Sequence, residues 1–488
     1  MHATVSLPAW AFVLLAFLAG WAVVDRLLRP AMRALLRRRA NRFIDELNTR
    51  LPLRVPSFKL TKREVLIDQL RFDPKVLEAA EAFAKETGAA REDVQKRVAR
   101  YAAEIVPAFN AWIYFRAGYA AARTLARALY RGRIGSADDA GLAAIPDGST
   151  VVFVMNHRSN MDYILLSYLA AERTALSYAV GEWARIWPIQ SLVRATGAYF
   201  VRRDAHDPLY RRVLERYVAM ATAHGVPQAV YPEGGLTRDG ALRPPKLGLL
   251  DYMLRGFDPG GARDLVFVPV GVNYDRVLED RTLVLDRSPA QGRSTPRDTL
   301  SGTLRFVRQN LRLLLTNDWH RFGYACVSFG SPLSTKGWLS SRSLDLMAAS
   351  REDRFAAVEA LAEELMARIG RIVPVLPVSL VSRVFVAAPE RALSEIELKA
   401  EVLAHWRVLE EAGAQVYVPR GDQDYAVTFG LRMLLQRHLV TVENGLFRAV
   451  PDELPLLRYY ANAIARPVSA QDRPHGPPQR TIPTRPAS

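Results

Sequence analysis

The sequence predicts an α/β fold in which helices cover a central sheet. Between about residues 136 and 375, short apolar runs alternate with helical patterns, and this alternation is typical of sheets whose strands are joined by helices. A largely apolar, uncharged stretch near the start and a long helical region near the end lie outside the alternation. We therefore expect an anchor and a helical subdomain before the α/β domain, and a further helical domain after it.

The candidate membrane anchor is Leu7 to Val24, and we place it within residues 1–30. The stretch carries no charged side chain and, at about 1.5 Å per residue, a helix of this length almost spans the apolar core of a bilayer. A cleaved signal peptide is the main alternative, but no positive charge except the amino terminus precedes the run, and no clear small-residue cleavage site ends it. Arginines are frequent from Arg26 to Arg42, so the positive-inside rule predicts a single-pass protein with its remaining chain in the cytoplasm.

Residues 31–135 are predicted to form a basic interfacial segment followed by a helical subdomain. Arg33 to Leu47 mixes apolar and basic residues, so it can lie along a membrane surface, and a solvated helix is the alternative. Residues 51–63 have the Pro and Lys/Arg punctuation of a linker. Helical periodicity then covers two stretches, interrupted near Pro107: Pro74 to Thr87 and Glu92 to Arg131.

Residues 136–375 are predicted to form the α/β domain. Its expected strands are Val151–Met155, Ala175–Val180, Ala198–Val201, Ala229–Tyr231, Leu265–Val272 and Tyr324–Phe329, and its expected long helices are Thr303–Leu315 and Arg351–Ile372. Ligands of such sheets bind beyond the carboxyl ends of the strands. His157, Arg202 and Glu233 each lie at or just beyond such an end. We expect these three residues to meet in one pocket.

Residues 376–465 are predicted to form a C-terminal helical domain with a small hairpin. Helical patterns at Ser394–Ala412 and Ala426–Arg437 flank the stretch Leu439 to Val450, which has Asn444-Gly445 at its centre. Asn-Gly suits the left-handed dihedral angles of a type I′ turn, so this stretch predicts two strands joined by a tight turn. The tail, residues 466–488, is rich in Pro, Arg, Gln and Ser, a composition that predicts disorder.

The charge predicts acidic partners. The net charge is +16 and the isoelectric point is about 10.0, values that often indicate nucleic-acid binding. Here the basic residues are spread along the whole chain without aromatic interleaving or a helix-turn-helix signal, so we expect no nucleic acid. Anionic membrane lipids and acidic small-molecule partners account for the charge equally well, and a GC-rich genome, which raises the arginine content without any function, is an inert explanation.

The chain has no pattern that predicts a metal or a cofactor. Cys326 is the only cysteine, so no disulfide within the chain is possible, and its apolar surroundings predict a small buried residue. Neither Cys nor His occurs at metal-ligand spacing, and no Gly-rich Lys-Ser/Thr loop is present. We expect no metal site and no nucleotide cofactor.

His157 and Asp162 are the candidate catalytic pair. They follow an apolar run and precede the apolar stretch Tyr163 to Leu169, so His157 is expected in a strand-to-helix loop and Asp162 in the first helical turn, where Ser159-x-x-Asp162 has the pattern of a capping box. The carboxylate can then hold the imidazole in one tautomer while the other ring nitrogen takes a proton from a substrate hydroxyl. A satisfied polar pair without catalytic work is the alternative.

Three further motifs follow in order: Gly197-Ala198-Tyr199-Phe200-Val201-Arg202-Arg203-Asp204, Tyr231-Pro232-Glu233-Gly234-Gly235-Leu236-Thr237-Arg238 and Val268-Pro269-Val270-Gly271-Val272. With the His157 motif, they resemble the glycerolipid acyltransferase superfamily over about residues 105 to 330. The double arginine and the Glu-Gly-Gly are more similar to the membrane-bound bacterial glycerol-3-phosphate acyltransferases than to the lysophosphatidate enzymes.

The resemblance implies an acyltransferase domain with a mixed sheet flanked by helices, in a protein of the bacterial inner membrane. It implies that acyl-CoA or acyl-carrier-protein donates a fatty acyl group to the sn-1 hydroxyl of glycerol-3-phosphate, and that donors around Gly197 and the Gly234-Gly235 turn stabilise the oxyanion. His157 is then the general base and Asp162 its partner. The expected acceptor-site residues are Arg202, Arg203, Glu233, Gly234, Gly235, Arg238 and Lys246. Surface ion pairs for the arginines and a capping role for Glu233 are the alternatives.

One departure from the family pattern concerns the acceptor. The family has Glu-Gly-Gly-Arg-Ser-Arg in the third motif, whereas this chain has Leu236 and Thr237 before Arg238. One of two expected cations at the acceptor phosphate is therefore absent. Lysophosphatidate or dihydroxyacetone phosphate as acceptor, and a non-catalytic membrane scaffold on the same fold, stay open as alternatives.

Overall fold

The computed structural model describes residues 55–170, 176–181, 189–202, 207–285, 322–346 and 348–465. Four predicted segments lie outside these ranges: the anchor at Leu7 to Val24, the interfacial segment at Arg33 to Leu47, the helix Thr303–Leu315 and the tail after residue 465. Within the described ranges, no helix is both long and apolar enough to cross a membrane.

A mixed eight-stranded sheet forms the centre of the molecule, as predicted. Its strands are β1 (Arg131–Ala137), β2 (Thr150–Met155), β3 (Ser177–Val180), β4 (Tyr199–Phe200), β5 (Gln228–Val230), β6 (Leu265–Tyr274), β7 (Tyr324–Phe329) and β8 (Leu333–Ser334). The order is β1-β7-β6-β2-β5-β3-β4, with β8 paired to β6. The pairs β6·β7 and β6·β8 are antiparallel and the others are parallel. The strands β2, β5, β3 and β4 therefore present their carboxyl ends at one edge.

Side chains of β2 alternate between two hydrophobic cores, because successive residues of a strand point to opposite faces. Val151, Phe153 and Met155 join one core, whereas Val152 and Val154 join the other. All six residues of β2 are buried. A strand covered on both faces explains the continuous apolar run in the sequence.

The N-terminal helices and α10, α11, α14 and α15 form the core on one face. They are α2 (Ser57–Leu60), α3 (Arg63–Arg71), α4 (Pro74–Thr87), α5 (Arg91–Ile105), α10 (Pro208–Ala223), α11 (Gly248–Arg255), α14 (Thr335–Ser341) and α15 (Arg351–Ile372). The predicted bounds of Pro74–Thr87 and Arg351–Ile372 are confirmed. Residues 51–63, predicted as a linker, include α2, in which Phe58 and Lys59 are buried.

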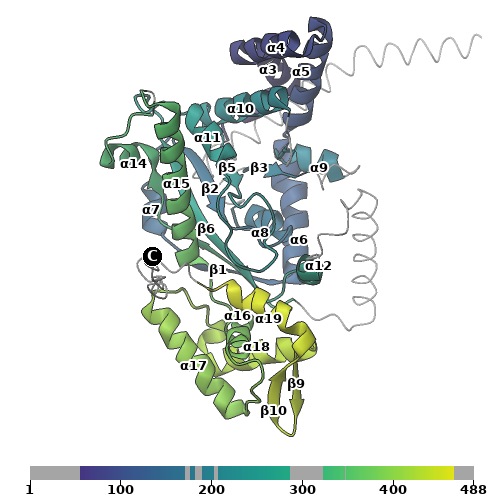
Figure 1. The fold of residues 1–488 in the computed structure, drawn as a ribbon, viewed down its shortest axis with the longest axis vertical. Coiled ribbons are helices and arrows are strands. Elements are labelled where there is room, and N and C mark those ends of the chain that lie inside the picture. The colour runs from purple at the N-terminus through teal and green to yellow at the C-terminus, as the bar shows by residue number, and fades with distance from the viewer. Residues whose placement is uncertain are drawn as a thin grey trace, which may run out of the picture.

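The other core joins α8 (Met161–Ala170) to the C-terminal helices. These are α16 (Pro377–Ala387), α17 (Glu395–Glu411), α18 (Gln423–Gln436) and α19 (Leu454–Asn462). Shorter elements complete the described chain: the π-helix η1 (Ile113–Gly118), α6 (Tyr119–Leu129), α7 (Asp139–Ala143), α9 (Ile189–Ala195), α12 (Asp280–Leu285), η3 (Pro419–Gly421) and η4 (Pro451–Glu453). In Figure 1, α3 to α5 lie at one end of the molecule and α17 at the other, with the sheet between them.

The predicted C-terminal hairpin is confirmed. The antiparallel strands β9 (Val440–Glu443) and β10 (Leu446–Ala449) are joined by Asn444 and Gly445, which both have positive φ angles, 53° and 77°. Two consecutive left-handed residues are the requirement of the type I′ turn that the Asn-Gly pair predicts.

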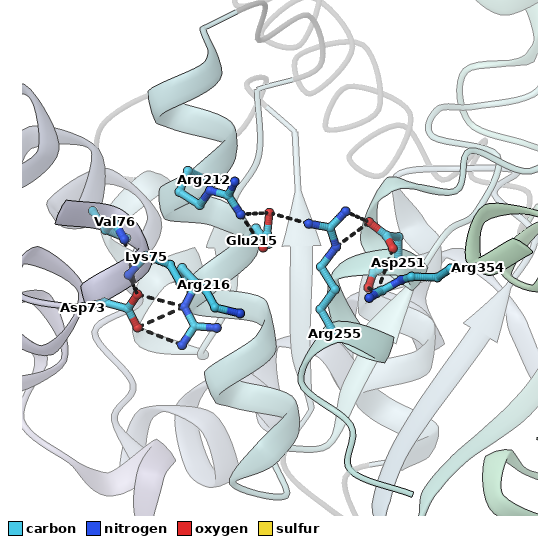
Figure 2. A network of polar contacts seen from close by, with 9 residues as sticks. All are labelled: Asp73, Lys75, Val76, Arg212, Glu215, Arg216, Asp251, Arg255 and Arg354. Carbon is cyan, nitrogen blue, oxygen red and sulfur yellow. Dashed lines mark hydrogen bonds and ion pairs between the residues drawn. The ribbon is translucent and has the colours of Figure 1, made fainter. Parts of the chain in front are cut away.

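Buried and half-buried charges join α10 to α4 and to α11, on the face of the sheet that the N-terminal helices cover (Figure 2). Asp73, the N-cap of α4, accepts a two-pronged ion pair from Arg216 of α10, with a shortest distance of 2.8 Å. Farther along, Arg255 of α11 contacts Glu215 of α10 at 3.2 Å and Asp251 at 2.9 Å. The N-terminal helices are thus fixed to the helix that follows the second sequence motif.

Candidate active site

His157 and Asp162 lie together at the carboxyl end of β2. The His157 Nδ1 is 2.9 Å from Asp162 Oδ2, and both residues are buried, with exposed fractions of 3% and 1%. His157 occupies the loop after β2, and Asp162 the first turn of α8. This geometry assigns the Nδ1–H as donor to the carboxylate. The predicted placement of both side chains agrees with the structure.

The Asp162 carboxylate is held by four hydrogen bonds. Besides the imidazole, Oδ2 accepts from the backbone N–H groups of Arg158 at 2.8 Å and Ser159 at 3.1 Å, and Oδ1 accepts from the Tyr274 hydroxyl at 2.6 Å. The bond from the Ser159 N–H is half of the predicted capping box, while the Ser159 hydroxyl accepts from Met161 N–H and donates to Glu279. The carboxylate therefore has one orientation, which fixes the imidazole.

The loop itself is pinned on both sides. Asn156 forms two hydrogen bonds with the backbone of Val272 in β6, at 2.9 and 2.8 Å. Glu279 accepts from the Ser159 hydroxyl and from Asn160. Asn156 and Glu279 approach from opposite ends of the loop, so the position of His157 is determined by side chains that do not touch its ring.

The outer nitrogen of the ring, Nε2, has no hydrogen-bond partner within the described ranges. An aromatic wall surrounds the imidazole instead: the Tyr231 ring centroid lies 4.1 Å away and the Tyr163 centroid 5.5 Å away. Tyr231 also lines a cavity of about 250 Å³. The Tyr231 side chain thus contacts the imidazole and also borders the cavity.

Glu233 orders the loops around His157. One carboxylate oxygen accepts from the backbone N–H of His157 at 2.8 Å and the other accepts from the backbone N–H of Arg243 at 3.0 Å. Burial raises the pKa of this carboxyl group to about 7, and the two backbone hydrogen bonds oppose the rise. Both oxygens thus accept from backbone N–H groups, so the carboxylate holds the loops of His157 and Arg243 together.

The cavity beside Tyr231 is rich in cationic side chains. Arg202, Arg211 and Lys246 line it together with the backbone of Gly234. Arg202 is already paired: its Nε and Nη2 bond both carboxylate oxygens of Glu104, at 2.8 and 2.6 Å, and its guanidinium lies over the Tyr101 and Tyr210 rings. A phosphate at Arg202 would therefore share this cation with Glu104.

Each glycine of the third motif lies beside a cationic side chain: Gly234 beside Lys246 and Gly235 beside Arg243. Gly234 has a φ of +66°, and a Cβ there would meet the Lys246 side chain at 2.5 Å. A larger residue at this position would be strained by the left-handed φ and would displace the Lys246 side chain. The N–H of Gly234 donates to Tyr231 within the turn, whereas the N–H of Gly235 has no acceptor in the described part of the chain.

The predicted residues not yet placed are Gly197, Arg238 and Arg203. Gly197, a candidate oxyanion donor, precedes β4 and so lies at the amino edge of the parallel strands, where its N–H donates to Arg194. Arg238 is exposed and has an interaction partner. Arg203 lies outside the described residues.

Several residues of the site escaped the sequence analysis. Tyr274 and Glu279 match the resembled family in sequence, but their role of holding Asp162 and the following loop was not predicted, because more than a hundred residues of chain separate them from that loop. Glu104, the partner of Arg202, lies 98 positions before it. Cys326 is buried as predicted, and burial raises the pKa of its thiol to about 12. Among the described residues no cluster of His, Cys, Asp and Glu has the arrangement of a metal site.

Comparison with known proteins gives two matches to family domains. Residues 138–273 match the acyltransferase family, and residues 302–466 match the C-terminal region of glycerol-3-phosphate acyltransferases. The crystal structure of the 1-acyl-sn-glycerophosphate acyltransferase from Thermotoga maritima covers 63% of this chain and 98% of that chain, at 17% identity and a TM-score of 0.30.

Several bacterial proteins with similar sequences are named glycerol-3-phosphate acyltransferase. The glycerol-3-phosphate acyltransferase of Aeromonas hydrophila is 30% identical over 417 residues, 83% of this chain and 50% of that protein. Its counterpart in Xanthomonas campestris is 28% identical over 361 residues, 72% of this chain and 39% of that protein. The one in Pasteurella multocida is 26% identical, with 83% and 50% covered. This chain spans half or less of the length of these relatives.

Proposed function

The chain belongs to the glycerol-3-phosphate acyltransferase family, and from this premise we propose that it transfers a fatty acyl group to the sn-1 hydroxyl of glycerol-3-phosphate. The product is lysophosphatidate. The observation that carries the proposal is the His157–Asp162 pair, fixed at a strand end beside a cationic cavity with Nε2 directed away from the carboxylate. The donor is an acyl thioester, either acyl-CoA or acyl-carrier-protein.

In the proposed mechanism, His157 Nε2 takes the proton of the acceptor hydroxyl as that oxygen attacks the thioester carbonyl. Asp162 keeps Nδ1 protonated and stabilises the imidazolium that forms. The tetrahedral oxyanion then collapses, the carbon–sulfur bond breaks and the imidazolium returns its proton to the departing thiolate. The N–H of Gly235, which has no acceptor among the described residues, is the backbone donor best suited to the oxyanion.

The acceptor phosphate is proposed to bind in the cationic cavity. Lys246 and Arg202 line it, and the predicted roles of Arg203 and Arg238 belong to the same proposal. Arginine forks form paired bonds to phosphate oxygens. Glu233 holds the surrounding loops, so its contribution is to the geometry of this pocket.

We place the protein at the cytoplasmic membrane, held by a single-pass anchor within residues 1–30. A basic interfacial segment and the helical subdomain follow to residue 135. The acyltransferase domain covers residues 136–375, the C-terminal domain residues 376–465 and a disordered tail residues 466–488. The apolar stretch Leu7 to Val24 and the arginines after it support the placement.

Leu236 favours one alternative, a different acceptor. Because the family pattern has an arginine there, a changed set of cations is consistent with lysophosphatidate or dihydroxyacetone phosphate. The test is to incubate membranes containing the protein with labelled acyl-CoA or acyl-carrier-protein and with each acceptor separately. Labelled lysophosphatidate from glycerol-3-phosphate is the expected product. Labelling only with another acceptor would replace the assignment, and labelling with none would leave the scaffold reading.

A further inference from the structure

An arginine lies at the Glu-Gly-Gly turn although Leu236 occupies the position where the family pattern has one. This residue is Arg243, ten positions after Glu233 in the sequence. A Cβ at Gly235 would have the Nη1 of Arg243 as its nearest neighbour, at 3.7 Å. Lys246 lies against the neighbouring Gly234. The segment 243–246 thus brings two cations to the glycine pair.

The backbone of Arg243 is fixed relative to His157. Its N–H donates to one oxygen of Glu233 at 3.0 Å, and the other oxygen accepts from the N–H of His157 at 2.8 Å. A single buried carboxylate therefore sets the separation between the catalytic loop and the residue that carries the guanidinium. A second contact joins the same two loops: the N–H of Thr237 donates to the carbonyl of His157 at 3.1 Å.

The Arg243 guanidinium is available for a ligand. The side chain is exposed, and within the described ranges it makes no hydrogen bond or ion pair. Arg202, in contrast, has both sides of its fork on Glu104, and Arg158 is buried with its Nη1 on the carbonyl of Gly240. Arg243 is therefore able to offer paired donors without first leaving a carboxylate.

We propose that Arg243 binds the phosphate of the acceptor and supplies the cation that is missing at Leu236. This inference rests on the proposed function, and it names the side chain that gives the pocket its preference for a phosphorylated acceptor. The reason is geometric: the guanidinium lies at the same glycine turn as the absent arginine, with its Nη1 3.7 Å from the position of a Cβ at Gly235. Lys246 contributes a second positive charge beside Gly234.

The test compares initial rates of the full-length protein and its variants, with glycerol-3-phosphate and acyl donor varied in turn. Arg243→Ala should raise the KM for glycerol-3-phosphate by about ten- to a hundredfold, the usual effect of losing a charge-assisted bond, and leave the acyl-donor KM within about twofold. Arg448→Ala, which removes an exposed arginine from β10, is the matched control and should leave both constants unchanged.

The decisive variant is Arg243→Ala combined with Leu236→Arg. If the two positions serve one phosphate, the second substitution should recover most of the acceptor KM that the first one loses. An unchanged acceptor KM in Arg243→Ala, or a rise in the acyl-donor KM instead, would overturn the role of Arg243 while wild-type turnover still supports the proposed function. Wild-type protein that acylates no phosphorylated acceptor overturns both.

Discussion

At the residue scale, the site depends on side chains that hold one another in a single orientation. The imidazole is aligned by Asp162, and Asp162 is aligned by Tyr274 and two backbone N–H groups. His157 and Asp162 were predictable because they lie five positions apart where an apolar strand gives way to an apolar helix, His157 in the loop and Asp162 in the first helical turn. The pairing of Arg202 with Glu104 was not, since nothing in the local sequence links residues 98 positions apart.

Glu233→Gln tests the ordering role at this scale. The amide replaces one acceptor with an NH2 group, which then faces a backbone N–H of His157 or Arg243, so one donor is left without an acceptor. We expect kcat to fall by about tenfold or more, with the loss appearing in kcat rather than only in the acceptor KM. Glu359→Gln, on the exposed side of α15, is the control. Wild-type kcat in Glu233→Gln would show that Glu233 does not position His157.

At the element scale, most strands and helices followed from apolar periodicity, but β1 did not. The strand Arg131–Ala137 contains two glycines and two arginines, and it lies at the sheet edge, paired only with β7. Gly135 is needed there because a Cβ would come within 2.6 Å of the Ser328 Oγ. Because glycines and arginines take the place of apolar residues in β1, the segment lacks the apolar pattern of a strand. The sequence therefore predicted the end of a helix at Arg131 and a domain boundary after residue 135.

Asp275 connects three elements, and among the described residues its carboxylate forms no ion pair. It follows β6, and its carboxylate accepts from Tyr324 N–H of β7 at 2.8 Å and from Val378 N–H of α16 at 3.1 Å. Burial raises the pKa of Asp275 from 3.8 to about 7. Because the native state then holds a proton that the unfolded state has lost, this group makes stability fall as pH rises from about 4 to about 7, and not outside that window.

Asp275→Asn should lower the unfolding free energy by about 1–3 kcal/mol, since the amide offers one acceptor to two backbone donors. It should also remove the part of the pH dependence between about pH 4 and 7 that belongs to this carboxyl group. Urea unfolding at several pH values measures both effects, with the exposed Asp452→Asn as control. An identical pH dependence in wild type and Asp275→Asn would contradict the assignment.

At the scale of the whole molecule, the C-terminal region reaches the catalytic loops. The Arg158 guanidinium lies 4.7 Å from the centre of the Tyr459 ring, and its Nη1 donates to the carbonyl of Gly240 at 2.7 Å. Asn462 donates to the carbonyl of Asp239 at 2.9 Å. The sequence predicted the C-terminal helices and their hairpin, but it contained no sign that α19 contacts Arg158 and the segment just after the third motif, because such contacts depend on the tertiary packing of distant segments.

The membrane proposal also belongs to this scale. Removing residues 1–25 should shift the protein toward the soluble fraction without releasing it fully, because Arg33 to Leu47 still attracts anionic lipid by about 1 kcal/mol for each basic residue near the surface. The residual binding to anionic vesicles should weaken as salt is added. Truncated protein that stays on the vesicles in high salt would point to an apolar attachment elsewhere in the chain.

The most direct test of the central claim is the rate of labelled acyl transfer by His157→Ala, measured in membranes that contain equal amounts of variant and wild-type protein. The claim is that His157 is the general base, whose loss typically costs about a hundred- to ten-thousandfold in rate. We predict that transfer falls by that amount while expression and membrane association stay at wild-type levels. A His157→Ala protein that retains more than about a tenth of wild-type turnover would contradict the assignment, because general-base loss costs far more.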